Sequence, residues 1–288
     1  MITLRAQIDR HLLVTFTPHL FHRHITRRAR QRLLLMRLVG NVMPLEKDVV
    51  VLDFDFLKIL SADASNSIAI GKEICANDVV RHLSFTGSTE VGRILMAQCA
   101  PTIKKLALEL GGNAPFIVFD DADLDSAVEG VVDAIWFNQG QVCCAGSRLL
   151  VQEGIAPRFY DKLKRRMDGL RVGDPLDKAI DIGAIVDPIQ LRTITDLVKN
   201  NPEGDHYQAP CPLPSLGSFY PPTLITGLGT ASPLMQEEIF GPVLVSMTFR
   251  TPDEAVLLAN NSRYGLAASI WSETIGLALD IAPKLQAG

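Results

Sequence analysis

The sequence lacks the features of several broad protein classes. Its 288 residues carry 28 basic and 32 acidic side chains, a formal net charge of -4, so no overall positive field favours nucleic acid. No run of about 18 apolar residues occurs, since Arg37 interrupts one stretch and Asp53 and Lys58 interrupt the next. The sequence therefore predicts neither a nucleic-acid partner nor a membrane-spanning helix.

Cysteine is scarce and irregularly spaced. The five cysteines are an odd number and two are adjacent: Cys75, Cys99, Cys143, Cys144 and Cys211. This is a poor framework for paired disulfides and is typical of a reducing compartment. We therefore expect free thiols and a cytoplasmic protein, or a mitochondrial one if the basic N-terminal segment is a presequence.

Residues 1–45 differ in composition from the rest of the chain. They hold eight arginines and four of the six histidines, with Asp9 as the one acid. The segment contains no serine, unlike most mitochondrial presequences, and no basic body follows it as a nucleic-acid arm would require. No cysteine or carboxylate cluster accompanies its histidines, so no metal site is predicted. We expect residues 1–45 to be a basic extension outside the fold.

From about residue 50 the chain alternates short apolar runs with helical patterns, which is typical of an α/β fold with a parallel sheet. We expect strands at 82–86, 115–119, 149–152, 243–249 and 267–271. We expect helices at 89–99, 156–170, 252–261 and 275–285, and one that begins at Pro188. Residues 204–222, rich in proline and glycine, are expected to form a loop.

Gly87 and Ser88 lie where a predicted strand passes into a helix. The free N–H groups and the hydroxyl at such a helix start can bind phosphate, but an ordinary turn with a helix cap has the same sequence pattern. The segment is not a dinucleotide fingerprint, because the chain has no GxGxxG. A phosphate site and a simple cap both remain open.

Two further residues have chemistry suited to catalysis. Glu109 ends an apolar run just before Gly111 and Gly112, where it is either exposed or, if buried, a base with a raised pKa. Cys143 follows the turn at Gly140, where a thiol is either an activated nucleophile or part of the core.

Four segments in order resemble the successive signatures of the NAD(P)-dependent aldehyde dehydrogenase superfamily: residues 85–92, 108–112, 140–148 and 236–243. The similarity runs from about residue 70 to residue 288. It implies an aldehyde dehydrogenase-like α/β fold, with a partial Rossmann-type cofactor domain and an α/β catalytic domain built on a parallel sheet. Residues 46–110 are then a remnant of the NAD(P)-binding domain and residues 111–288 the catalytic domain.

The resemblance also implies a reaction, the oxidation of a small aldehyde to a carboxylic acid. Cys143, two residues after the glutamine of the family motif, corresponds to the nucleophile, and Cys144 is its neighbour. Glu109 corresponds to the general base that activates water to release the acid from a thioester. The backbone N–H of Cys143 is an implied donor to the oxyanion.

The cofactor implied by the resemblance is NAD or NADP. Gly87 and Ser88 match positions that lie against its pyrophosphate, Glu238 matches the residue that holds the nicotinamide ribose, and Phe240 packs beside that ribose. The family's lysine that contacts the adenosine ribose has no counterpart here, so the sequence does not choose between the two cofactors.

The chain also departs from the family pattern. Its two tryptophans, Trp136 and Trp271, lie outside any Pro-Trp-Asn-like segment, which supplies the family's second oxyanion donor. Family members also continue beyond the position of Gly288 into an oligomerisation strand. We therefore expect a chain truncated at both ends, with any homo-oligomer weakened.

Residues 108–125 resemble the succinate-semialdehyde dehydrogenase branch, whose members place an arginine six residues before the nucleophile. Here that position is Phe137, which cannot neutralise a substrate carboxylate, so we expect an uncharged aldehyde, with succinate semialdehyde as the alternative. Two other functions stay open: a non-catalytic relic or interaction protein, and a cofactor-independent esterase that uses Cys143.

Overall fold

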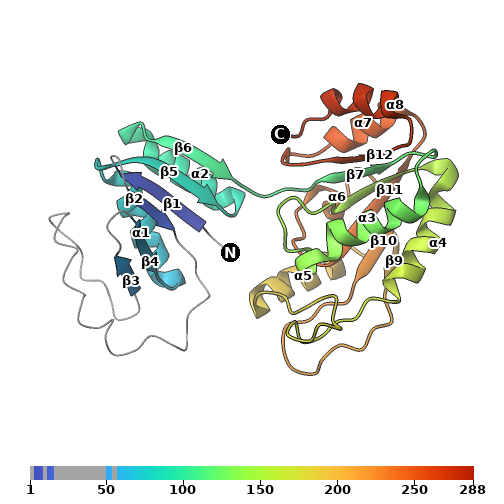
Figure 1. Cartoon of the computed structure of the whole chain (residues 1–288), viewed down its shortest axis with the longest axis horizontal. Helices are drawn as coiled ribbons and strands as arrows, with labels where there is room; N and C mark the ends of the chain where they lie inside the picture. The colour runs from blue at the N-terminus through green and yellow to red at the C-terminus, as the bar shows by residue number, and fades with distance from the viewer. Residues whose placement is uncertain (1–2, 9–11, 16–49, 54–56) are drawn as a thin grey trace. The chain divides into compact units, whose positions relative to one another are not determined.

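The computed structural model describes residues 3–8, 12–15, 50–53 and 57–288, and it divides the chain into two compact units, Met1–Leu110 and Gly111–Gly288 (Figure 1). The division falls where the sequence predicts the cofactor-binding part to end and the catalytic part to begin; the roles of the two parts stay predictions. Within the described ranges, no helix is long and apolar enough to cross a membrane.

The first unit is a mixed sheet with helices packed on it. Its strands are β1 (Thr3–Ile8), β2 (Leu12–Thr15), β3 (Val50–Asp53), β4 (Leu57–Ser61), β5 (Val80–Thr86) and β6 (Lys105–Glu109). Their order is β3-β4-β2-β1-β5-β6, in which β5 with β6 and β2 with β4 are parallel pairs and the other pairs are antiparallel. Its helices are α1 (Ala64–Ala76), α2 (Thr89–Cys99) and a 3₁₀-helix at Ala100–Thr102.

A small apolar core joins these elements. Leu83 and Phe85 of β5 are fully buried and pack with Ile70 of α1 and Leu95 of α2. Two strands, β1 and β2, fall within residues 1–45, and β1 pairs with β5. Most of the predicted basic extension lies outside the described residues, and its assignment stays a prediction.

The second unit is a six-stranded sheet covered on both faces. Its strands are β7 (Pro115–Val118), β8 (Arg148–Gln152), β9 (Asp205–Gln208), β10 (Thr223–Thr226), β11 (Val243–Phe249) and β12 (Ser269–Trp271). The order is β12-β7-β8-β11-β10-β9, with every pair parallel except β9 with β10. This agrees with the parallel sheet expected from the sequence.

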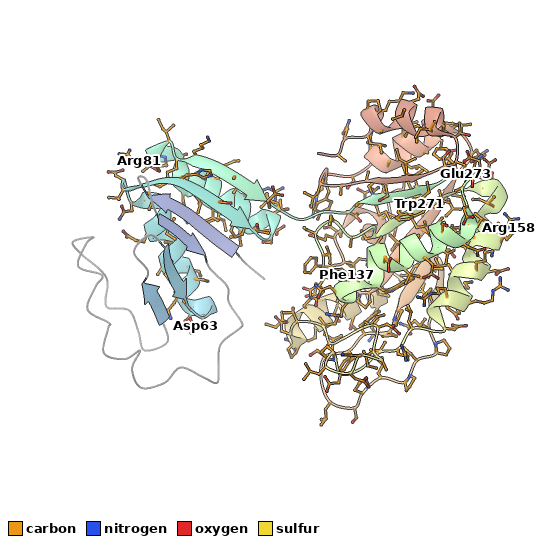
Figure 2. All side chains as sticks on the ribbon, viewed as in Figure 1. Asp63, Arg81, Phe137, Arg158, Trp271 and Glu273 are labelled. Atoms are coloured by element: carbon orange, nitrogen blue, oxygen red, sulfur yellow. The ribbon has the colours of Figure 1, made fainter. Side chains whose placement is uncertain are left out.

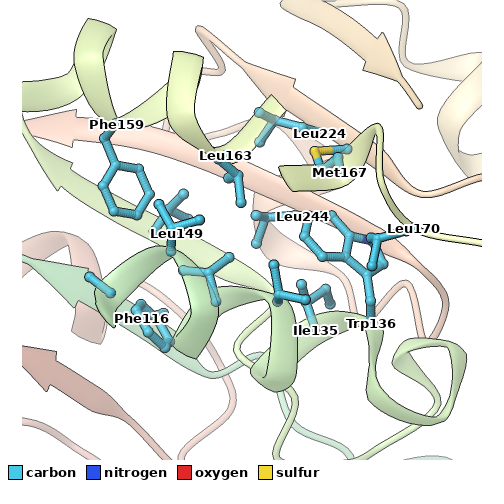
Figure 3. Packing of buried hydrophobic residues seen from close by; sticks show 14 of the residues in the cluster. Phe116, Ile135, Trp136, Leu149, Phe159, Leu163, Met167, Leu170, Leu224 and Leu244 are labelled. Atoms are coloured by element: carbon cyan, nitrogen blue, oxygen red, sulfur yellow. The ribbon is translucent and has the colours of Figure 1, made fainter. Parts of the chain in front are cut away.

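Helices cover the two faces of this sheet. They are α3 (Leu124–Trp136), α4 (Ala156–Met167), α5 (Pro188–Asn200), α6 (Pro233–Gln236), α7 (Pro252–Asn260) and α8 (Ile275–Ile281), with 3₁₀-helices at Phe137–Gly140, Glu153–Ile155 and Ala282–Lys284. One core, drawn in Figure 3, packs α3 and α4 against Leu149 and Val151 of β8. Leu150, between them, points to the opposite core beneath α5 and α7. A strand buried on both faces explains the continuous apolar run in its sequence.

Most elements match the expectation from the sequence. The expected cap at Pro188 is present, since the Asp187 side chain accepts a hydrogen bond from the N–H of Gln190. The loop expected at 204–222 is wrong over Asp205–Gln208, which forms β9. The sequence DHYQ shows no apolar alternation because β9 is a mostly exposed edge strand whose order comes from pairing with β10.

Candidate active site

Three of the predicted site residues come together in the first unit. Thr86 pairs with Glu109 in the parallel register of β5 and β6, and the N–H of Gly87 donates to the carbonyl oxygen of Glu109 at 3.0 Å. Gly87 and Ser88 therefore lie beside Glu109 at the carboxyl ends of the two strands. Open α/β sheets usually bind ligands at this edge.

The side chains of this group are accessible. Ser88 and Glu109 are both exposed. The Ser88 hydroxyl caps α2, because its oxygen accepts from the N–H of Val91 at 3.3 Å. Its hydroxyl hydrogen remains able to donate, so the cap and a phosphate contact are compatible at this helix start.

Cys143 lies in the second unit, in the irregular segment between α3 and β8. The turn before it holds Asn138, Gln139 and Gly140 at φ angles of 48°, 59° and 70°. Only glycine fits at position 140, because a Cβ there would lie 2.1 Å from the carbonyl oxygen of Gly241. Two non-glycine residues in the left-handed region indicate a strained turn held by its surroundings.

Side-chain amides hold this turn. The Nδ2 of Asn138 donates to the carbonyl of Gln141 at 3.0 Å. The Oε1 atoms of Gln139 and Gln141 accept from the N–H groups of Gly183 at 3.1 Å and Val186 at 2.9 Å. Sequence reasoning missed these positioning residues, and the available signal was the run of amides in NQGQ beside a glycine.

Two glycines bring the Cys143 segment close to Glu238. A Cβ on Gly112 would lie 2.0 Å from the carbonyl oxygen of Cys143, and one on Gly111 would lie 2.3 Å from Oε2 of Glu238. The N–H of Gly112 also donates to Oε1 of Glu238 at 3.0 Å. The segments before β7, β8 and β11 therefore meet at the amino edge of the parallel sheet, and Glu238 presents acceptor oxygens of the type that bind ribose hydroxyls.

Phe240 lies in the same place. Its φ of 52° is again left-handed, and its carbonyl accepts from Nε2 of Gln190 at 3.1 Å. Phe240 and Glu238 line a small hollow together with Val142 and Ser147. Cys143, Glu238 and Phe240 thus lie together at the amino edge of the second unit's sheet. The three predicted residues of the first unit likewise lie together, at the carboxyl ends of β5 and β6.

The surroundings of Cys143 disfavour its charged form. The residue is partly buried, and burial raises the pKa of its thiol, with smaller contributions from Cys144 and from the carboxylate of Glu238. The N–H groups of Cys144 and Cys143 act in the opposite direction. Cys143 is therefore mainly a thiol at neutral pH, and its activation requires a proton acceptor.

A buried cation stabilises the backbone behind the site. Arg148 is 2% exposed and donates to the carbonyl oxygens of Asn113, Leu258 and Ala259 at 2.8, 3.1 and 2.8 Å. Burial lowers its pKa to about 10, so the guanidinium stays charged at neutral pH. Three carbonyl partners satisfy much of its donor capacity.

Metal-binding clusters and disulfides are both absent from the part of the chain that is described. No group of three His, Cys, Asp or Glu side chains there is arranged to hold a metal ion. All five cysteines are free thiols.

Comparison with known proteins gives a consistent result. The aldehyde dehydrogenase family matches residues 57–288. A probable succinate-semialdehyde dehydrogenase (NADP+) of Sinorhizobium fredii (strain NBRC 101917 / NGR234) is 40% identical over 232 residues, which cover 78% of this chain and 46% of that protein. The 3-sulfolactaldehyde dehydrogenase of Pseudomonas putida is also 40% identical over 232 residues, covering 80% of this chain and 48% of that protein.

Solved structures agree with the sequence relatives. The crystal structure of an NAD-dependent aldehyde dehydrogenase from Sinorhizobium meliloti superposes with a TM-score of 0.76 at 35% identity, covering 81% of this chain and 46% of that one. This confirms the predicted aldehyde dehydrogenase-like α/β fold. The chain spans about half the length of the curated relatives it matches. On its sequence and its fold, the chain belongs to the aldehyde dehydrogenase family.

Proposed function

We propose that the protein oxidises an aldehyde to a carboxylic acid with NAD+ or NADP+, with Cys143 as nucleophile and Glu109 as general base. The observation that carries the proposal is the placement of Cys143 just after a strained turn, packed on Gly112 and close to Glu238. Such placement costs stability and is typical of functional sites. The overall reaction consumes the aldehyde, water and NAD(P)+ and yields the acid, NAD(P)H and a proton.

In this mechanism the Cys143 thiol gives its proton to a water molecule and its sulfur attacks the aldehyde carbon, giving a thiohemiacetal whose oxyanion accepts a hydrogen bond from the Cys143 N–H. The chemistry supplied by NAD(P)+ when bound is acceptance of a hydride from the Cys143-bound substrate. Cys143 then carries the acyl group as a thioester. Glu109 takes a proton from the water that attacks the thioester, and the acid leaves as the Cys143 sulfur is released.

The chain's residues fit a dinucleotide in two respects. The start of α2 offers N–H groups and the Ser88 hydroxyl to a phosphate beside Gly87, although Glu90 in the same turn opposes an anion. Glu238 offers carboxylate oxygens to ribose hydroxyls, and Phe240 offers an apolar face beside it. The Sinorhizobium fredii relative is named for NADP+ and the Sinorhizobium meliloti structure for NAD+, so the activity of this chain should be measured with both cofactors.

For the substrate we propose an uncharged aldehyde. Phe137, six residues before Cys143, is 70% exposed at the end of α3 and offers an apolar surface instead of a cation (Figure 2). The wild type should then have a higher kcat/KM for propanal than for succinate semialdehyde. Phe137→Arg should shift that ratio toward succinate semialdehyde by about tenfold, because a guanidinium can pair with the distal carboxylate. An unchanged ratio would reject this assignment.

Mass spectrometry of the trapped intermediate tests the nucleophile. The purified chain, quenched during turnover of propanal with NAD+ or NADP+, should carry an acyl group on the peptide that contains Cys143. Cys143→Ala should abolish the adduct, and Cys144→Ala should retain it. An adduct on Cys144 alone, or one that survives Cys143→Ala, would overturn the assignment.

We further propose that the protein works in a reducing compartment, the cytoplasm or, alternatively, the mitochondrion. The five free thiols, including the exposed Cys144, support this. We also propose that copies of the chain associate as a homo-oligomer. Fractionation of the source cells with an antibody against the chain would test the compartment, and recovery among secreted proteins would contradict it.

A further inference from the structure

A single buried amide links the two loops of the second unit's site. Asn113 is 3% exposed and follows Gly112 directly. Its Nδ2 donates to the carbonyl oxygen of Met235 at 2.9 Å, and its Oδ1 accepts from the hydroxyl of Ser147 at 2.8 Å. Both ends of the side-chain amide are thus engaged, each with a different segment.

The two partners stand close in sequence to the two site residues. Ser147 lies four residues after Cys143, at the end of the same irregular segment. Met235 lies in α6, three residues before Glu238. A side chain that donates to one segment and accepts from the other therefore fixes the spacing between the Cys143 segment and the Glu238 segment.

The backbone of Asn113 is itself immobilised. Its carbonyl oxygen accepts from Nε of Arg148, and the same guanidinium is anchored on Leu258 and Ala259 at the end of α7. On the other side, Gly112 packs on the Cys143 carbonyl and donates to Glu238. A shift of Asn113 would therefore be passed to Cys143 and to Glu238 through direct contacts.

We propose that Asn113 is a positioning residue for the aldehyde dehydrogenase reaction. The two hydrogen bonds of its side-chain amide fix the position of the Cys143 segment relative to the Glu238 segment. The proposal rests on the proposed function. Losing either bond leaves a buried polar atom without a partner and frees one segment from the other. Because the two bonds lead to different site residues, they are separable by substitution.

Two substitutions each break one bond. Asn113→Asp keeps an oxygen to accept from Ser147 but, as a carboxylate, cannot donate to the Met235 carbonyl. Ser147→Ala removes the donor to Asn113 and leaves the bond to Met235 in place. Asn260→Asp is the matched control for the first, because Asn260 likewise donates to a backbone carbonyl, that of Lys284, and accepts a backbone N–H, that of Gln286.

Ser246→Ala is the matched control for the second substitution, since this buried hydroxyl bonds the Leu149 carbonyl inside the core at 2.9 Å. The readouts are the alkylation rate of Cys143 by iodoacetamide, followed by peptide mass spectrometry, and kcat and the cofactor KM measured separately. We expect Asn113→Asp to raise the cofactor KM about tenfold while the alkylation rate changes less. We expect Ser147→Ala to change the alkylation rate about fivefold with the cofactor KM near wild type.

Melting temperatures are measured for all four variants, since a structural role alone would lower them without separating the two readouts. The proposal is overturned if Asn113→Asp and Ser147→Ala behave like their controls, or if both shift the two readouts in the same proportion. If Asn113→Asp does not fold, Ser147→Ala alone decides through the alkylation rate. The alkylation rate of Cys143 can be measured without turnover. An inactive wild-type chain would therefore reject the proposed function, while the effect of Ser147→Ala on alkylation would still test whether Asn113 positions the Cys143 segment.

Discussion

The two groups of candidate site residues differ in the backbone that carries them. Gly87, Ser88 and Glu109 lie at the ends of a regular strand pair and a regular helix, and two of their side chains are exposed. Cys143 and Glu238 instead lie in irregular segments that precede strands, at the edge formed by the amino ends of the strands in the second unit's sheet. The second group is held by glycine packing, left-handed residues and side-chain amides. Local sequence determines the first group, whereas tertiary contacts determine the second.

The difference predicts unequal tolerance to substitution, with the largest effect at Gly112. Gly112→Ala places a Cβ 2.0 Å from the Cys143 carbonyl oxygen, a backbone atom that cannot move aside alone. We expect a loss of roughly 4 kcal/mol or more in the free energy of unfolding, measured by urea denaturation. Gly71→Ala in α1 is the control, because its Cβ would meet only Leu95 at 3.7 Å. Equal effects of the two substitutions would remove the contrast between the groups.

A smaller effect is expected at Ser88. Ser88→Ala removes the hydroxyl that caps α2, so the free energy of unfolding of the first unit should fall by about 1 kcal/mol. Ser88→Asn should retain most of the stability, since asparagine caps equally well. The same pair separates capping from cofactor binding: a rise in cofactor KM shared by both variants points to the hydroxyl itself. A loss as large as that of Gly112→Ala would show that the first group is not the more tolerant one.

The smallest effect concerns the charge beside Cys143. Because burial and the Glu238 carboxylate raise the pKa of the Cys143 thiol, its alkylation rate should reach half-maximum at a higher pH than that of free cysteine. Glu238→Gln removes the negative charge and can still accept from Gly112, so the pKa should fall and alkylation at pH 8 should accelerate on the order of twofold. Slower alkylation in this variant would show that Glu238 acts as the proton acceptor for Cys143.

The same contrast explains what the sequence could predict. The helix at 89–99 and its cap follow from local residues, and the structure has both at Thr89–Cys99 and Ser88. Local residues explain only part of the left-handed turn at Asn138 and Gln139, because Asn138 tolerates positive φ and bonds the Gln141 carbonyl, whereas the contacts to Gly183 and Val186 come from tertiary structure. The strand β9 was missed for the same reason, since only its neighbour β10 makes it a strand.

The positions of Cys143, Glu238 and Phe240 were inferred from the family resemblance and not from the physics of the chain. Residue types alone left Cys143 undecided between a core thiol and a nucleophile. Local sequence patterns do not show that Gly111 and Gly112 approach these loops. The segments in contact are about 30 to 130 residues apart, and only the folded sheet brings them together.

The central claim is tested most directly by the formation of reduced nicotinamide from propanal by the purified chain, with NAD+ and with NADP+. We expect aldehyde-dependent turnover that Cys143→Ala abolishes, with a loss on the order of a thousandfold or more, and that Cys144→Ala retains. Turnover that survives Cys143→Ala, or a folded wild-type chain with no turnover, would contradict the account. In the second case, ester hydrolysis that needs Cys143 but no cofactor would favour the esterase, and its absence would favour a non-catalytic relative.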